Sequence, residues 1–170
     1  MSRELSSVLE FDDIQHILLT RAPALTGRYE FLSFRGPVGG RAWLAGILDK
    51  VHSAKTMRES VDKDKRWITV AFTWNGLRTL GVDATTLATF PEEFREGMAA
   101  RAEVLGDTGA NDPSHWVDQT ARPDLHAIAI LFARDAAERG STGPWNIEPG
   151  LYSRPRGPWA LHPASCSPQS

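Results

Sequence analysis

Short apolar stretches of strand length, separated by helical or polar segments, constrain the fold of this chain more than any other feature. Trp67 to Phe72 alternates in polarity and predicts a buried strand. Leu125 to Phe132 is apolar except for His126, which is typical of a strand covered on both faces. The aromatic residues of Arg28 to Phe34 favour another strand, and the apolar content of Ile14 to Thr20 predicts one before it.

Helical periodicity is clearest in Arg41 to His52, where apolar residues form one stripe on a 3.6-residue period. The stripe consists of Trp43, Leu44, Ile47, Leu48 and Val51. The residues expected to break the chain just before this helix are Gly36, Pro37, Gly39 and Gly40. After it, the charges between Ser53 and Arg66 nearly cancel, which predicts a solvated loop.

Two further helices are marked by their ends. Thr73 is a suitable N-cap for a short helix over Trp74 to Leu80, and Gly81 can end that helix in a left-handed conformation. Pro91 begins the second helix at its first position, and Gly106 stops it. The inner face expected for this second helix consists of Phe94, Met98, Ala102 and Leu105.

The expected order is strand, strand, helix, strand, short helix, helix, strand. Helices between strands, without a Rossmann-type glycine fingerprint, favour an α+β sandwich with helices on one face of a mainly antiparallel sheet. We expect residues 1–11 to be an N-terminal arm and residues 12–139 to be the domain. Residues 140–170 hold six of the eleven prolines and show no periodicity, so we expect a disordered Pro/Gly/Ser-rich tail.

The charge and hydropathy of the chain argue against several classes of partner. Its 19 basic and 21 acidic side chains are interspersed and give a net charge of -2. Nucleic-acid binding usually needs a strongly basic face, so we expect no such partner. No run of about 18 apolar residues exists, so we expect no membrane span. The first ten residues lack the apolar middle of a secretory signal, and the expected compartment is the cytoplasm.

Residue types that carry chemistry form no recognisable constellation. The one cysteine, Cys166, cannot form an internal disulfide or make a thiolate metal site alone. The histidines, whose spacings fit no local metal cluster, are His16, His52, His115, His126 and His162. The sequence therefore nominates no catalytic residue, no cofactor-binding residue and no metal ligand.

Five segments in a fixed order give the chain a family resemblance. They are Asp13 to Gln15, Arg28 to Leu32, Val70 to Gly81 (VAFTWNGLRTLG), Thr89 to Met98 (TFPEEFREGM) and Asp124 to Ala127. Together they resemble the N-terminal half of dye-decolorizing-type (Dyp-type) haem peroxidases, over roughly residues 12–139. Each segment alone is weak evidence, and their joint occurrence in order carries the resemblance.

The resemblance implies a ferredoxin-like α+β fold, usually two related halves in one chain, with haem held mainly by the second half. It implies hydrogen-peroxide-dependent oxidation of dyes and other reducing substrates. In the family a histidine of the C-terminal half ligates the iron, and an aspartate in a G-x-x-D-G pattern, with an arginine, assists peroxide cleavage. That pattern does not occur in this sequence. His126 is a conceivable axial ligand, but a structural histidine with one satisfied hydrogen bond is the favoured interpretation, as it is for His16.

We therefore expect a fold that is incomplete relative to the two-half family fold, binds no haem by itself and is inactive alone. Such a chain is expected to associate with itself or with the missing C-terminal half. The alternative is a non-enzymatic ferredoxin-like binding or assembly module. The fold alone does not decide between them, because this architecture hosts many functions.

Overall fold

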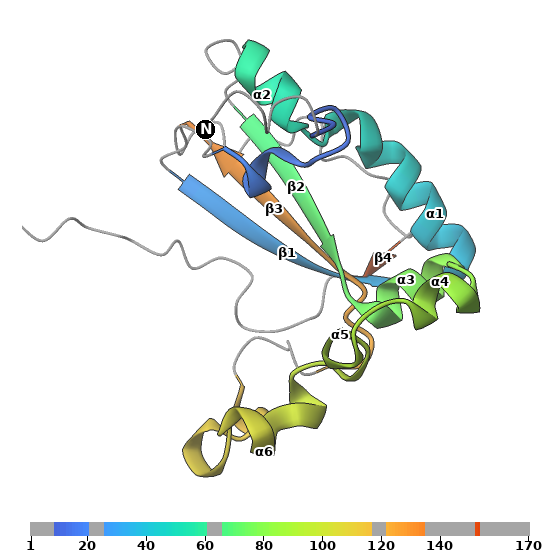
Figure 1. The fold of residues 1–170 in the computed structure, drawn as a ribbon, viewed down its shortest axis with the longest axis vertical. Coiled ribbons are helices and arrows are strands. Elements are labelled where there is room, and N and C mark those ends of the chain that lie inside the picture. Colours follow the sequence, from blue (N-terminus) through green and yellow to red (C-terminus); the bar gives the residue numbers. More distant parts are fainter. Residues whose placement is uncertain (1–8, 21–25, 61–65, 117–121, 135–151, 154–170) are drawn as a thin grey trace, which may run out of the picture.

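The computed structural model describes residues 9–20, 26–60, 66–116, 122–134 and 152–153 (Figure 1). Four strands form one sheet in the order β2-β3-β1-β4, and each pair of neighbours is antiparallel. The strands are β1 (Thr26–Phe34), β2 (Arg66–Phe72), β3 (Ala127–Ala133) and β4 (Tyr152–Ser153). The predicted α+β class with a mainly antiparallel sheet is confirmed.

The described residues contain six short α-helices. They are α1 (Gly36–Ile47), α2 (Ala54–Ser60), α3 (Trp74–Leu80), α4 (Ala84–Ala88), α5 (Glu92–Glu96) and α6 (Ala102–Leu105). Helix α1 runs along the sheet, while α5 and α6 belong to an excursion beyond the end of the sheet (Figure 1). None of the residues 91–116 in this excursion is buried.

The core lies between α1 and one face of the sheet, as strand alternation requires. Leu131 stands opposite Ile68 in the register of β2 and β3, and both belong to this core. The other strand residues of the core are Leu32, Phe34, Val70, Ala127 and Ala129. Trp43 and Ile47 of α1 close this core and are each only 1% exposed. Gly40 lets α1 approach closely, because a Cβ there would lie 2.9 Å from a Leu80 methyl carbon.

The opposite, helix-free face of the sheet is only partly covered. Tyr29 is 62% exposed, and its cross-strand partner Ile130 is half-buried. Phe31 and its partner Ile128 form the next row and are also half-buried. The prediction that the strand after Leu125 is covered on both faces is therefore wrong, since β3 alternates between buried and half-buried positions.

Several sequence predictions near the N-terminus are also wrong. Ile14 to Thr20 forms no strand but a 3-10 turn at His16–Leu18. The glycines and proline of residues 36–40 do not break the chain but begin α1, with the proline in its first turn. This helix ends at Ile47, and Leu48 of the predicted stripe is 65% exposed.

The charged segment from Ser53 to Arg66 is not wholly a loop, because it contains α2. The Ser53 hydroxyl accepts a hydrogen bond from the Thr56 amide, as an N-cap does. Two apolar side chains, Ala54 and Met57, are buried and anchor the helix. Two buried residues in a charged segment are too few for a periodicity signal, which explains the missed helix.

The helix expected to run on from Glu92 to Leu105 is interrupted at Gly97, which has a φ of 76°. Its expected inner face is not buried, with Phe94 37%, Met98 63% and Leu105 49% exposed. The predicted stop at Gly106, with a φ of 79°, is confirmed. The expected tail differs at Tyr152–Ser153, which pairs with β1; the rest of residues 140–170 lies outside the described residues.

We predict that Gly76→Ala strongly destabilises the fold, because a Cβ at this position would lie 1.8 Å from the His126 carbonyl oxygen. Backbone atoms cannot yield as a flexible side chain does, so we expect a loss of about 3 kcal/mol or more in unfolding free energy. Urea denaturation measures it. The matched control is Gly46→Ala in α1, where nothing lies within 4 Å. Gly46→Ala should raise the free energy of unfolding by about 0.5–1 kcal/mol, because it lies in a helix. Equal losses in both variants would contradict the close approach of Gly76 to the His126 carbonyl.

Candidate functional site

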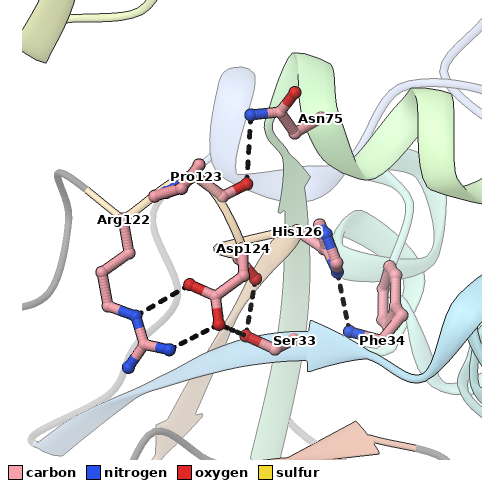
Figure 2. Close-up of polar contacts among 7 residues, drawn as sticks. All are labelled: Ser33, Phe34, Asn75, Arg122, Pro123, Asp124 and His126. Carbon is pink, nitrogen blue, oxygen red and sulfur yellow. Dashed lines mark hydrogen bonds and ion pairs between the residues drawn. The ribbon is translucent and has the colours of Figure 1, made fainter.

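A polar junction forms where β1 ends, β3 begins and α3 begins (Figure 2). Its side chains come from three distant parts of the sequence. They are Ser33, Asn75, Arg122, Asp124 and His126. Of these, sequence reasoning singled out only His126, because the others show no motif spacing and meet through long-range strand pairing.

Local sequence explains how α3 reaches this junction. The Thr73 hydroxyl accepts a hydrogen bond from the Gly76 amide at 3.0 Å, so the predicted N-cap is confirmed. The same hydroxyl donates to the Leu125 carbonyl at 2.6 Å, and the Thr73 amide donates to the His126 carbonyl at 3.1 Å. Gly81 ends α3 in the left-handed conformation, with a φ of 84°, as predicted.

The His126 ring is held on both sides. Its Nδ1 accepts a hydrogen bond from the Phe34 amide at 2.8 Å, and the two rings are stacked with centroids 5.5 Å apart. Its Nε2 lies 3.4 Å from the Thr79 hydroxyl oxygen. Burial lowers the pKa of His126, and the Asp124 carboxylate opposes that effect. His126 is thus a neutral structural histidine with a satisfied hydrogen bond, as the favoured interpretation had it.

The Asp124 carboxylate is equally committed. Arg122 donates to both of its oxygens, and the Nε to Oδ1 distance is 2.7 Å. The Ser33 hydroxyl donates to the Asp124 backbone carbonyl and lies 3.4 Å from Oδ2. The hydrogen bond from Arg122 lowers the pKa of Asp124, so the carboxylate stays ionised at neutral pH. An ionised, ion-paired carboxylate is a poor proton donor, which favours a structural role.

The remaining histidines lie apart from the junction. His16 is 1% exposed and packs its ring edge-on against Phe132, with centroids 6.0 Å apart. The expectation of a satisfied hydrogen bond at His16 is wrong, because neither of its buried ring nitrogens has a hydrogen-bond partner among the described residues. His52 lies beside His16, and His115 is exposed in the excursion, with Nδ1 3.2 Å from the Gly109 carbonyl oxygen. His162 and Cys166 lie outside the described residues, as does most of the segment that surrounds them.

The described residues do not fit a haem group. An axial histidine needs a ring nitrogen free to face an open cavity, but the His126 nitrogens face Phe34 and Thr79. The His16 ring is enclosed between Phe132 and His52. No group of three or more potential metal-ligating side chains occurs within the described ranges. No helix there is long and apolar enough to cross a membrane.

Comparison with known proteins identifies the family. A family profile described as the DyP dimeric alpha+beta barrel domain matches residues 42–142, more than half of the 170 residues. No protein with a curated description matches the chain.

Solved structures of dye-decolorizing peroxidases share the fold. DyP2 from Amycolatopsis sp. ATCC 39116 matches with a TM-score of 0.68 and 22% identity, over 85% of this chain and 31% of that one. AauDyP complexed with imidazole matches with a TM-score of 0.69 and 21% identity, over 87% and 32%. A decolorizing peroxidase from Auricularia auricula-judae matches with a TM-score of 0.63 and 22% identity, over 77% and 28%. The chain thus spans about a third of the length of these proteins or less.

We predict that acidification below about pH 6.5 destabilises the fold. Burial is the main cause that lowers the pKa of His126 and of His16, so the unfolded chain takes up protons that the folded chain resists. Stability is then full above about pH 6.5 and falls below it, by at most about 1.4 kcal/mol per pH unit for each histidine. The carboxylates of Asp83, Asp112 and Asp124, whose pKa is lowered, act only at lower pH. Urea denaturation at pH values above and below about 6.5 tests it; a flat profile would contradict it.

Proposed function

This chain belongs to the family of the DyP dimeric alpha+beta barrel domain, and we propose that it serves as the N-terminal half of a dye-decolorizing-type haem peroxidase. The complete enzyme would use hydrogen peroxide to oxidise dyes and other reducing substrates. In this proposal the activity belongs to two α+β halves together, and this chain alone is inactive.

The observation that carries the proposal is the helix-free face of the sheet. The partly exposed residues on that face are Tyr29, Phe31, Ile128 and Ile130. Aromatic and branched apolar side chains that the described residues leave partly exposed on one face are typical of an association surface. A second α+β half would bury this face as α1 buries the other one.

The chemistry of the described residues indicates which catalytic groups the second half would have to supply. Haem, when bound, supplies the iron that reacts with peroxide, and it needs an axial ligand and a nearby acid–base group. The His126 ring and the Asp124 carboxylate both serve the polar junction instead. The sequence contains no G-x-x-D-G pattern. We therefore assign the iron ligand and the acid–base group to the second half.

We propose that the N-terminal boundary of the domain lies near residue 12, outside the 42–142 range of the family profile. The Ile14 carbonyl accepts a hydrogen bond from the Ala54 amide at 2.7 Å. Gln15 binds the edge of β2 through Val70. These contacts tie the segment to the sheet, as expected of a domain that begins before β1.

We predict that the purified chain, incubated with haem, takes up no stoichiometric haem and catalyses no peroxide-driven dye oxidation. The reason is that the His126 ring nitrogens face Phe34 and Thr79, and the His16 ring is only 1% exposed. Absorption spectroscopy is the measurement. A Soret band at one haem per chain, lost in His126→Ala and retained in the exposed-residue control His115→Gln, would make His126 a ligand and overturn this assignment.

We predict that the chain self-associates at micromolar concentration through the helix-free face, and that Tyr29→Glu weakens this association by at least about tenfold. A charge placed in an apolar interface is desolvated without a partner. Sedimentation velocity measures it. Leu48→Glu, just after α1, is a matched control, because Leu48 is 65% and Tyr29 62% exposed. A monodisperse monomer with a sharp two-state melt would count against the half-domain and favour a stand-alone binding module.

A further inference from the structure

The free edge of β2 is closed by residues 11–20, which we name the N-terminal strap. The Gln15 side chain binds Val70 like a neighbouring strand. Its Nε2 donates to the Val70 carbonyl at 2.9 Å, and its Oε1 accepts from the Val70 amide at 2.8 Å. The strap lies across one end of β2 and β3 (Figure 1). A side-chain amide thus occupies an edge that would otherwise be open for strand pairing.

A second set of hydrogen bonds ties the strap to the segment before α2. The His16 amide donates to the His52 carbonyl at 2.9 Å, and the Ala54 amide donates to the Ile14 carbonyl at 2.7 Å. The His52 amide in turn donates to the Ile68 carbonyl of β2 at 3.4 Å. The strap is therefore held by a few backbone hydrogen bonds, by the Gln15 side chain and by the buried ring of His16.

The His16 ring is an unusual choice for this buried position. The residue is 1% exposed, and neither ring nitrogen has a hydrogen-bond partner among the described residues. Its ring packs edge-on against Phe132 and against His52, with centroids 6.0 Å and 6.4 Å apart. A neutral imidazole tolerates such a site at a cost. A charged imidazole needs hydrogen-bond acceptors for two N–H groups and a compensating negative charge. The described residues provide no hydrogen-bond acceptor for either ring nitrogen.

Several charged groups on the strap and on the elements beside it have partners other than the His16 ring. On the strap itself, Asp12 is paired with Lys55 of α2 at 3.0 Å. From α2, the Arg58 guanidinium lies 4.0 Å from the centre of the Phe11 ring. The Arg134 guanidinium, after β3, lies 5.9 Å from the Trp67 ring of β2.

Two further ionisable groups complete these surroundings. Asp13 also belongs to the strap, and Arg66 begins β2. Burial first, and then the nearby His52, lower the pKa of His16, and no carboxylate opposes them.

We propose that His16 is an acid-sensitive latch: when its ring takes up a proton, the N-terminal strap leaves the edge of β2 and uncovers Phe132. Opening lets the charged ring reach water and meet both of its N–H donors. It breaks the backbone bonds to His52 and Ala54 and exposes the edge at Val70. The rest of the sheet, which the strap does not pair with, stays folded.

The uncovered surface is continuous with the helix-free face. Phe132 pairs with Trp67 across β3 and β2, and this row follows the row of Tyr29 and Ile130 on the same face. Latch opening therefore enlarges the surface that, resting on the proposed function, we assign to the second half. The latch itself does not depend on that assignment.

Amide hydrogen exchange of the whole chain, followed by NMR at pH 7.5 and pH 5.5 and corrected for intrinsic rates, tests the latch. The Ala54 amide reports strap opening, and the Ala129 amide of the central strand β3 reports global unfolding. Opening restores the ordinary histidine pKa of about 6.5. At one pH unit below that value, protonation raises the equilibrium constant for strap opening by up to about tenfold. We expect Ala54 to lose up to about tenfold in protection over this range while staying less protected than Ala129, as local opening of the strap requires.

Two variants separate the latch from a general acid effect. His16→Phe keeps an aromatic ring against Phe132 but cannot take up a proton, so its Ala54 protection should not change with pH. His115→Gln removes an exposed histidine and should behave like the wild type. Unchanged wild-type protection at Ala54, or an equal loss in His16→Phe, would overturn the proposal.

A measurement on the wild type stands apart from the folding of any variant. The His16 ring signals should titrate with a midpoint below 6.5 that coincides with the loss of Ala54 protection. A His16 midpoint at the ordinary value, or one unrelated to the Ala54 transition, would equally overturn the latch. Neither outcome bears on haem uptake or dye oxidation, so the latch and the proposed function fail separately.

Discussion

The unequal cover of the two faces of the antiparallel sheet is the constraint on which the rest of the structure depends. One face packs against α1, where Trp43 and Ile47 are almost fully buried. The other face is covered unevenly: Phe132 packs against His16 and Trp67 is fully buried, whereas Tyr29 stands 62% exposed. Because apolar burial is the main favourable term in folding, a sheet in this state has stabilisation still to gain from a partner. The family match identifies the DyP dimeric alpha+beta barrel domain, and the proposed second half would cover the partly exposed face.

The polar junction and the strap satisfy backbone groups at the end and at one edge of this small sheet. At one end, His126 accepts a hydrogen bond from the Phe34 amide, and Asp124 accepts one from the Arg122 side chain. At one edge, Gln15 satisfies Val70 in place of a further strand. His126 and Asp124, which are residue types common in catalysis, thus make structural hydrogen bonds here. For this reason the proposal assigns the iron ligand and the acid–base group to the second half.

Much of the fold followed from local sequence. The alternation in β2, the aromatic residues of β1 and the apolar run of β3 predicted the three principal strands. The ends of α3 followed from the chemistry of Thr73 and Gly81. The start of α1 did not, because Gly40 is suited to a close contact with Phe34 and Leu80 that only tertiary structure reveals. The polar junction escaped prediction for the same reason, since residues near 33, 75 and 124 meet only after the strands pair.

The central claim, that the helix-free face is an association surface, is tested most directly by hydroxyl-radical footprinting across a range of protein concentrations. Tyr29 on that face and Met98 in the excursion start with equal access to solvent, being 62% and 63% exposed. The account predicts that Tyr29 and Phe31 become protected as concentration rises into the micromolar range, while the reactivity of Met98 stays constant. Protection of Met98 with unchanged reactivity of Tyr29 would contradict it.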